Sequence, residues 1–271
     1  MNHHVTIKAE KLAKEVYSVK RIFKIAIGSL TFALVPSLPA LAAMHSGSNP
    51  KVIFQKAPIT NPATLFYDAQ HGISAIAHSP FHLSAEMINQ QGQNVTKPFG
   101  VKIFSTTQLI KKEQFSNGEI EKDYITTGFA VANTASDPSY NNTNWDSTGA
   151  VEAWGTSYWN NVTVSGDSEI KLTKITGGWN NNDNLITLQS PKVTMSADGW
   201  SRNGGYVTNQ NKVFYPSLFE YPFQYTYYAP SSWYSISANN TSARSFGQKT
   251  DITLVRGTST WSLYLNDLFE G

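Results

Sequence analysis

Residues 101–132 read VKIFSTTQLIKKEQFSNGEIEKDYITTGFAVA, and this stretch decides the fold class. Two runs rich in β-branched and aromatic residues flank the pair Asn117-Gly118. Asn and Gly both tolerate the positive φ angles that a tight hairpin turn requires. The stretch therefore predicts a long antiparallel hairpin with strands at Val101–Phe115 and Glu119–Ala132.

Short segments of the same character continue toward the C-terminus, separated by turn residues. They are predicted as strands at Ala150–Trp154, Val162–Ser165, Glu169–Ile175, Leu185–Leu188, Lys192–Met195, Tyr206–Thr208, Phe223–Tyr228, Trp233–Ile236, Asp251–Val255 and Thr260–Leu265. This regular spacing is typical of an all-β protein, a β-sandwich or a jelly-roll-like antiparallel domain. We expect one such domain over residues 64–271, preceded by an extended lead-in at residues 44–63.

One short helix is predicted at residues 80–91. Ser79 suits an N-cap, and Pro80 suits the first helical position because its missing N–H is not needed there. The apolar residues that would form the buried face are Phe81, Leu83, Met87 and Ile88.

The N-terminal residues have the pattern of an export signal. Lys20, Arg21 and Lys24 precede the apolar run Ile25–Leu41, and small residues close it at 40–43. This pattern predicts a cleaved signal peptide at residues 1–43. An uncleaved membrane anchor is the alternative, although a run of about 17 residues is short for a bilayer.

The chain contains no cysteine, which excludes a disulfide framework and a thiolate metal site. Export without disulfides favours a secreted or cell-surface protein of a Gram-positive bacterium. The whole chain has 21 Lys+Arg and 19 Asp+Glu, of which the leader holds six and two. The remaining 15 basic and 17 acidic residues are scattered, so nucleic acid is not an expected partner.

Aromatic residues beside small polar ones give the main indication of function. The chain has seven tryptophans, and Trp179 and Trp200 are each flanked by Gly and by Asn or Ser, which predicts surface turns. A sugar offers an apolar face and a hydroxyl rim, and ring-plus-amide surfaces match both. We expect a ligand site at Trp179, Asn180, Trp200, Tyr225 and Tyr227 for an extracellular glycan or cell-wall polymer.

Packing is the alternative account of these rings, since aromatic side chains commonly fill the core between sheets. The tryptophans expected in the core, because they lie inside strand patterns, are Trp154, Trp233 and Trp261.

Three residues suggest a metal site only weakly. Imidazole and carboxylate can bind zinc, and His78, His82 and Glu86 lie close in sequence. Pro80 separates the two histidines, so they cannot share one regular helix as in a zinc-protease motif. We expect no metal and no other cofactor.

Two carboxylates are the weak catalytic candidates. Glu152 and Glu220 each have aromatic neighbours in a strand-like context, where a β-jelly-roll glycoside hydrolase would place its acids. No motif links the two, and the chain lacks a Gly-x-Ser-x-Gly motif, a phosphate loop and a dinucleotide fingerprint. A binding protein is therefore favoured over an enzyme.

A membrane-active protein, such as a β-pore-forming toxin or a bacteriocin-like factor, is the second hypothesis. The Ser/Thr-bearing hairpin at 101–132 and the abundance of Tyr and Trp favour contact with a membrane surface. The charges of Lys111, Lys112, Glu113, Glu119 and Glu121 oppose it, because they would have to cross the bilayer or stay at the hairpin tip. A structural role in a cell-surface layer also fits the composition.

Overall fold

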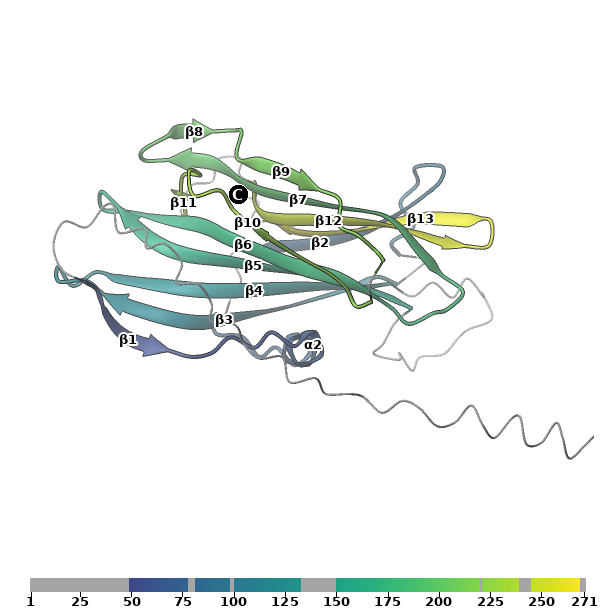
Figure 1. Cartoon of the computed structure of the whole chain (residues 1–271), viewed down its shortest axis with the longest axis horizontal. Helices are drawn as coiled ribbons and strands as arrows, with labels where there is room; N and C mark the ends of the chain where they lie inside the picture. The colour runs from purple at the N-terminus through teal and green to yellow at the C-terminus, as the bar shows by residue number, and fades with distance from the viewer. Residues whose placement is uncertain are drawn as a thin grey trace, which may run out of the picture. The chain divides into compact units, whose positions relative to one another are not determined.

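The computed structural model describes residues 49–77, 81–97, 100–132, 150–219, 221–238 and 245–268 (Figure 1). Most of these residues lie in antiparallel β-strands, as the sequence predicts. The predicted leader at residues 1–43 lies outside the described residues.

The first sheet has seven strands in the order β1-β3-β4-β5-β6-β10, with β11 also paired to β6. Its strands are β1 (Lys51–Gln55), β3 (Lys102–Gln114), β4 (Ile120–Ala132), β5 (Val151–Val164), β6 (Asp167–Asn181), β10 (Phe223–Tyr228) and β11 (Ile236–Ser237). The predicted hairpin is confirmed as β3 and β4, with Gly118 in the turn at φ 86°. β1 lies within the predicted extended lead-in.

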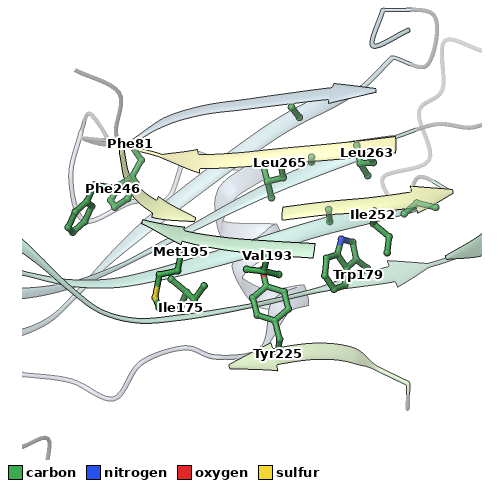
Figure 2. Packing of buried hydrophobic residues seen from close by; sticks show 14 of the residues in the cluster. Phe81, Ile175, Trp179, Val193, Met195, Tyr225, Phe246, Ile252, Leu263 and Leu265 are labelled. Carbon is green, nitrogen blue, oxygen red and sulfur yellow. The ribbon is translucent and has the colours of Figure 1, made fainter. Parts of the chain in front are cut away.

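The second sheet has six strands in the order β2-β13-β12-β7-β8, with β9 also paired to β7. Its strands are β2 (His82–Asn89), β7 (Thr187–Ser201), β8 (Gly205–Val207), β9 (Asn211–Phe214), β12 (Ser245–Arg256) and β13 (Ser259–Leu268). Buried side chains from both sheets form one hydrophobic cluster, part of which Figure 2 shows. The face of each sheet that meets this cluster is called its inner face below.

A row of three glycines crosses the inner face of the first sheet. Gly128, Gly155 and Gly177 occupy matched register positions on β4, β5 and β6. A Cβ atom added to Gly177 would lie 2.1 Å from the hydroxyl of Tyr225, and one on Gly155 would lie 3.0 Å from Nε2 of Gln248. Because these two glycines have no side chains, they leave room on the inner face for the side chains of Tyr225 and Gln248.

The buried polar groups over this row are paired. The Tyr225 hydroxyl donates a hydrogen bond to Oε1 of Gln248 (2.8 Å), and Gln248 Nε2 donates to the carbonyl of Thr176 (3.1 Å). Pairing matters here, because a buried polar group without a partner costs free energy.

Helix α2 (Pro62–Gln70) covers part of the outer face of the first sheet. Asn61 caps it by accepting a hydrogen bond from the Thr64 amide (3.1 Å), and Pro62 takes the first turn. Its buried residues pack against Phe129 of β4 and Trp154 of β5. No helix in the described ranges is long and apolar enough to cross a membrane.

The prediction of a helix at residues 80–91 is wrong, because His82–Asn89 forms strand β2. Ala85 and Met87 are buried while Glu86 between them is exposed, which is the alternation of a strand. All eight residues of β2 pair with β13, from His82 opposite Leu268 to Asn89 opposite Trp261. The apolar residues at alternate positions fit a strand once β13 supplies hydrogen-bond partners.

Candidate functional site

The two tryptophans predicted at the surface lie in strands instead of turns. Trp179 is in β6 and only 1% exposed, and Trp200 is half-buried in β7 opposite Tyr206. Figure 2 shows the Trp179 ring beside Val193, Ile252 and Tyr225 in the core. The prediction of a surface turn at Trp179 is therefore wrong.

The reason lies in the glycines that precede Trp179. Gly177 and Gly178 suggest a turn in the sequence, but both lie inside β6. A Cβ on Gly178 would lie 2.3 Å from the Phe223 carbonyl oxygen of the neighbouring strand. These glycines allow close approach of other chain segments, which is the second common role of glycine in a strand.

The remaining residues of the predicted ligand site fall on two faces. Tyr225 is buried beside Trp179, and Tyr227 is half-buried and stacked on Phe214 with ring centroids 3.8 Å apart. Asn180 lies on the opposite, outer face, so the five residues do not form one surface. The core assignment is confirmed for Trp154 and Trp233, and Trp261 packs half-buried against the core.

The metal candidates do not come together. His78 lies outside the described residues, while His82 and Glu86 are exposed on β2. Four residues along a strand place these two roughly 13 Å apart. Within the described ranges, no group of three or more His, Cys, Asp or Glu side chains could hold a metal ion.

Of the two catalytic candidates, Glu220 lies outside the described residues. Glu152 is half-buried on the outer face of β5, where it accepts a hydrogen bond from Nδ2 of Asn180 (3.1 Å). Burial raises the pKa of Glu152, and the Asn180 hydrogen bond acts in the opposite direction. The register neighbours of Glu152 are Val131 and Asn180, so neither adjoining position supplies a second carboxylate.

The outer face of β5, β6 and β10 gathers polar and aromatic side chains that the sequence did not single out as a group. They are called the open strip: Glu152 and Tyr158 of β5; Lys171, Lys174, Thr176 and Asn180 of β6; Gln224, Thr226 and Tyr228 of β10. Each is exposed or half-buried. Within the strip, Trp154 of β5 is buried beside the α2 residues, and its ring lies next to Gly178 of β6.

One end of the open strip is built around Lys174. Register places Tyr158 on one side of it and Tyr228 on the other. The Lys174 ammonium lies 3.7 Å from the centroid of the Tyr158 ring, a close cation–π contact. Burial lowers the pKa of Lys174 and raises the pKa of Tyr158. Tyr228 is 63% exposed and presents its ring to solvent.

Three exposed rings lie on the connection between β9 and β10. Tyr215 is 75% exposed, Phe219 is 97% exposed and Tyr221 is 66% exposed. They are called the aromatic loop. β10 begins with Phe223 opposite Trp179, so the loop leads into the Asn180 end of the open strip. The sequence alone does not separate these rings from the strand-like aromatic residues that follow, although Pro216 and Pro222 indicate a connection.

Comparisons with known proteins give no relatives: no family model matches the chain, and no curated protein or solved structure matches it.

Proposed function

We propose that the protein binds an extracellular glycan or cell-wall polymer along the open strip and is not an enzyme. The observation that carries the proposal is the composition of this one sheet face. Two tyrosine rings lie at one end, hydroxyl and amide groups lie between, and the Asn180–Glu152 pair lies at the other end. A site that binds a sugar needs both apolar surfaces and directional hydrogen-bond partners.

The dimensions of the strip favour a chain-like ligand. Three neighbouring strands give a width of about 10 Å, and the distance along β6 from Lys171 to Asn180 is about 30 Å. A long, open surface of this kind accommodates several linked sugar units better than one small molecule. Several weak contacts along a chain then add to a useful affinity.

Glycoside hydrolysis has less support than binding. The reaction requires two carboxyl groups on either side of the scissile bond. Glu152 is hydrogen-bonded to an amide, and the neighbouring register positions hold no carboxylate. If Glu152 and Glu220 do catalyse hydrolysis, Glu152→Gln abolishes it; unchanged hydrolysis in Glu152→Gln and Glu220→Gln removes these assignments.

We also infer that the two sheets form a β-sandwich and that the protein is extracellular. Two antiparallel sheets that share one core are consistent with a β-sandwich. Export through a signal peptide at residues 1–43 would place the strip outside the cell, where glycans and cell-wall polymers are found. A Gram-positive host fits the absence of cysteine.

A glycan panel with matched tyrosine variants tests the proposal. Tyr228→Ala removes an exposed ring from the strip, while Tyr264→Ala removes a ring from the second sheet. Both rings lie beside a lysine, Lys174 in register with Tyr228 and Lys249 over Tyr264. We expect weaker binding in Tyr228→Ala alone. Binding to no glycan, or equal loss in both variants, contradicts the proposed surface.

The aromatic loop favours a second candidate, contact with a lipid bilayer. An almost fully exposed Phe219 is flanked by two exposed tyrosines, and such amphipathic rings are enriched at membrane interfaces. Sedimentation with phosphatidylcholine vesicles tests this, with Phe219→Ser as the variant. Leu185→Ser is the control, because Leu185 is an exposed apolar residue elsewhere. Equal vesicle binding by both variants and the wild type removes the loop from consideration.

Pore formation by the β3–β4 hairpin would need a larger change. The hairpin lies between β1 and β5, and its Thr126, Thr127 and Phe129 side chains are buried. These strands would have to leave both neighbours before entering a bilayer. Dye leakage from vesicles at high protein concentration would support this hypothesis, and its absence removes it.

A further inference from the structure

We propose that Lys171 and Lys174 of β6 bind anionic groups of the ligand, so that the polymer recognised on the open strip is acidic. This inference rests on the proposed function, because it assigns a chemical class to the ligand of the same surface. It also predicts that neutral glycans bind more weakly than acidic ones.

A β-bulge places the two lysines on one face. Residues three apart in a regular strand point to opposite faces, since side chains alternate. The register of β5 with β6 passes from Tyr158 opposite Lys174 to Trp159 opposite Leu172, which leaves Thr173 as an extra residue. Leu172 and Ile175 are both buried in the core, and their neighbours Lys171 and Lys174 therefore both face outward.

Neutral groups hold the two ammonium groups. Lys174 lies over the Tyr158 ring at 3.7 Å, and Lys171 donates a hydrogen bond to the Ser231 carbonyl oxygen at 3.5 Å. No ion pair joins either lysine to a carboxylate among the described residues. A ring or a single carbonyl leaves donors of the ammonium group available, because lysine has three.

Among the residues paired across the sheet at the level of Lys171, the first carboxylate is Asp123 of β4. Asn160 lies opposite Lys171, and Asp123 lies opposite Asn160, which puts Asp123 about 10 Å away. Asp123 is itself opposite Lys111 of β3, whose charge acts on it. Glu169, two residues before Lys171 on β6, accepts hydrogen bonds from the Arg202 amide and the Ser235 hydroxyl, and neither β6 lysine forms an ion pair among the described residues.

A second lysine–tyrosine pair shows the balanced arrangement. On the outer face of the second sheet, Lys249 lies 5.0 Å from the centroid of the Tyr264 ring. Asp251 faces Tyr264 across the strands; burial raises its pKa, and the nearby charges of Lys192 and Lys249 act in the opposite direction. That lysine has a carboxylate beside it, whereas Lys174 has none. Lys249 is therefore the matched control.

Half-burial of both β6 lysines supports an anionic ligand. Burial lowers the pKa of Lys171 and of Lys174, since it disfavours the charged form of an amine. An anion bound beside them would offset this effect and strengthen the ammonium form. Carboxylate and phosphate groups both accept such charge-assisted hydrogen bonds, so the test includes both.

The experiment measures the affinity of the purified protein for three polymers. Polygalacturonate carries carboxylates, poly(glycerol phosphate) carries phosphates, and dextran is the uncharged chain. We expect at least one acidic polymer to bind about tenfold more tightly than dextran, which corresponds to one added charged hydrogen bond. Raising the salt concentration from 50 to 500 mM should weaken that binding, because salt screens exposed charges.

Three variants decide between the site and general charge. Lys174→Gln and Lys171→Gln should each weaken binding of the acidic polymer about tenfold, while Lys249→Gln should leave it unchanged. Thermal unfolding confirms that each variant is folded. A preference for phosphate or for carboxylate supports the inference and names the anion.

Three results overturn the inference, and they are distinguishable from one another. Equal binding of dextran and the acidic polymers, unaffected by Lys174→Gln, overturns the inference and leaves the proposed function in place. Binding of none of the polymers by the wild-type protein overturns both. A loss in Lys249→Gln as large as that in Lys174→Gln also overturns the assignment to β6.

Discussion

Gly177→Ala is expected to destabilise the protein strongly, since the space that its Cβ would need is already occupied. The Tyr225 hydroxyl would lie 2.1 Å from the new Cβ, and the Trp154 carbonyl oxygen would lie 2.6 Å from it. The second atom belongs to the backbone of β5, so the clash cannot be relieved by a side-chain rotation alone. Tyr225 would have to leave its place over the glycine row.

The magnitude follows from two separate costs. Overpacking of a filled core costs about 1–3 kcal/mol. Moving Tyr225 also breaks its 2.8 Å hydrogen bond to Gln248, and a buried group left without a partner costs about 1–3 kcal/mol. We therefore expect Gly177→Ala to lower the free energy of unfolding by about 2–6 kcal/mol.

Urea denaturation of wild type and variants measures this quantity. Tyr225→Phe removes the hydrogen bond without adding an atom, so it should cost less than Gly177→Ala. Gly155→Ala should also cost less, since the atom nearest to its Cβ would be Nε2 of the Gln248 side chain at 3.0 Å, which is not a backbone atom. A change within about 0.5 kcal/mol for Gly177→Ala, the usual effect of a surface substitution, would refute the reasoning.

Three further predictions concern other parts of the molecule. Glu169→Ala removes a fully buried carboxylate that accepts hydrogen bonds from the Ser235 hydroxyl and a backbone amide; it should lower the free energy of unfolding by about 2 kcal/mol or more in urea titrations, and no change would contradict this. Burial raises the pKa of Asp123 from 3.8 to about 6, so this group stabilises the folded state below pH 3.8, and that contribution is lost as pH rises through 6. Relative to wild type, Asp123→Asn should therefore gain thermal stability between pH 4 and pH 7, and a parallel pH dependence of the two proteins would oppose this. Asn61→Ala should lower stability by about 1 kcal/mol through loss of the α2 cap, with faster amide exchange confined to the helix; uniform exchange rates across the chain would argue against a local effect.

Local signals in the sequence were sufficient for the hairpin but not for residues 80–91. Asn117-Gly118 fixes the β3–β4 turn from its own backbone preferences, and the structure confirms it. The partner of β2 is β13, whose pairing joins Glu86 to Tyr264 far along the chain. A cap residue and a proline in front of residues 82–89 carry no information about that partner, so the helix prediction failed.

Helix α2 was missed although its signals are present. Asn61 and Pro62 form the same kind of start that Ser79 and Pro80 offered, and here the structure uses it. Only Leu65 and Ala69 of α2 become buried, so its apolar face is narrow. Only the first two residues of α2 fell within the predicted lead-in at 44–63, and no element was predicted for residues 64–70.

The open strip could not be predicted from side-chain alternation, and the reason is the extra residue at Thr173. Counting by twos through β6 places Lys171 and Lys174 on opposite faces, and the same count places one of Leu172 and Ile175 in solvent. The core accepts both apolar residues only if one residue is left out of the register. The Thr173 hydroxyl fixes this arrangement by donating to the Tyr158 carbonyl oxygen (3.0 Å), and its own carbonyl accepts from the Ala229 amide. The bulge that completes the core is therefore also what brings two unpaired positive charges onto the surface proposed to bind the ligand.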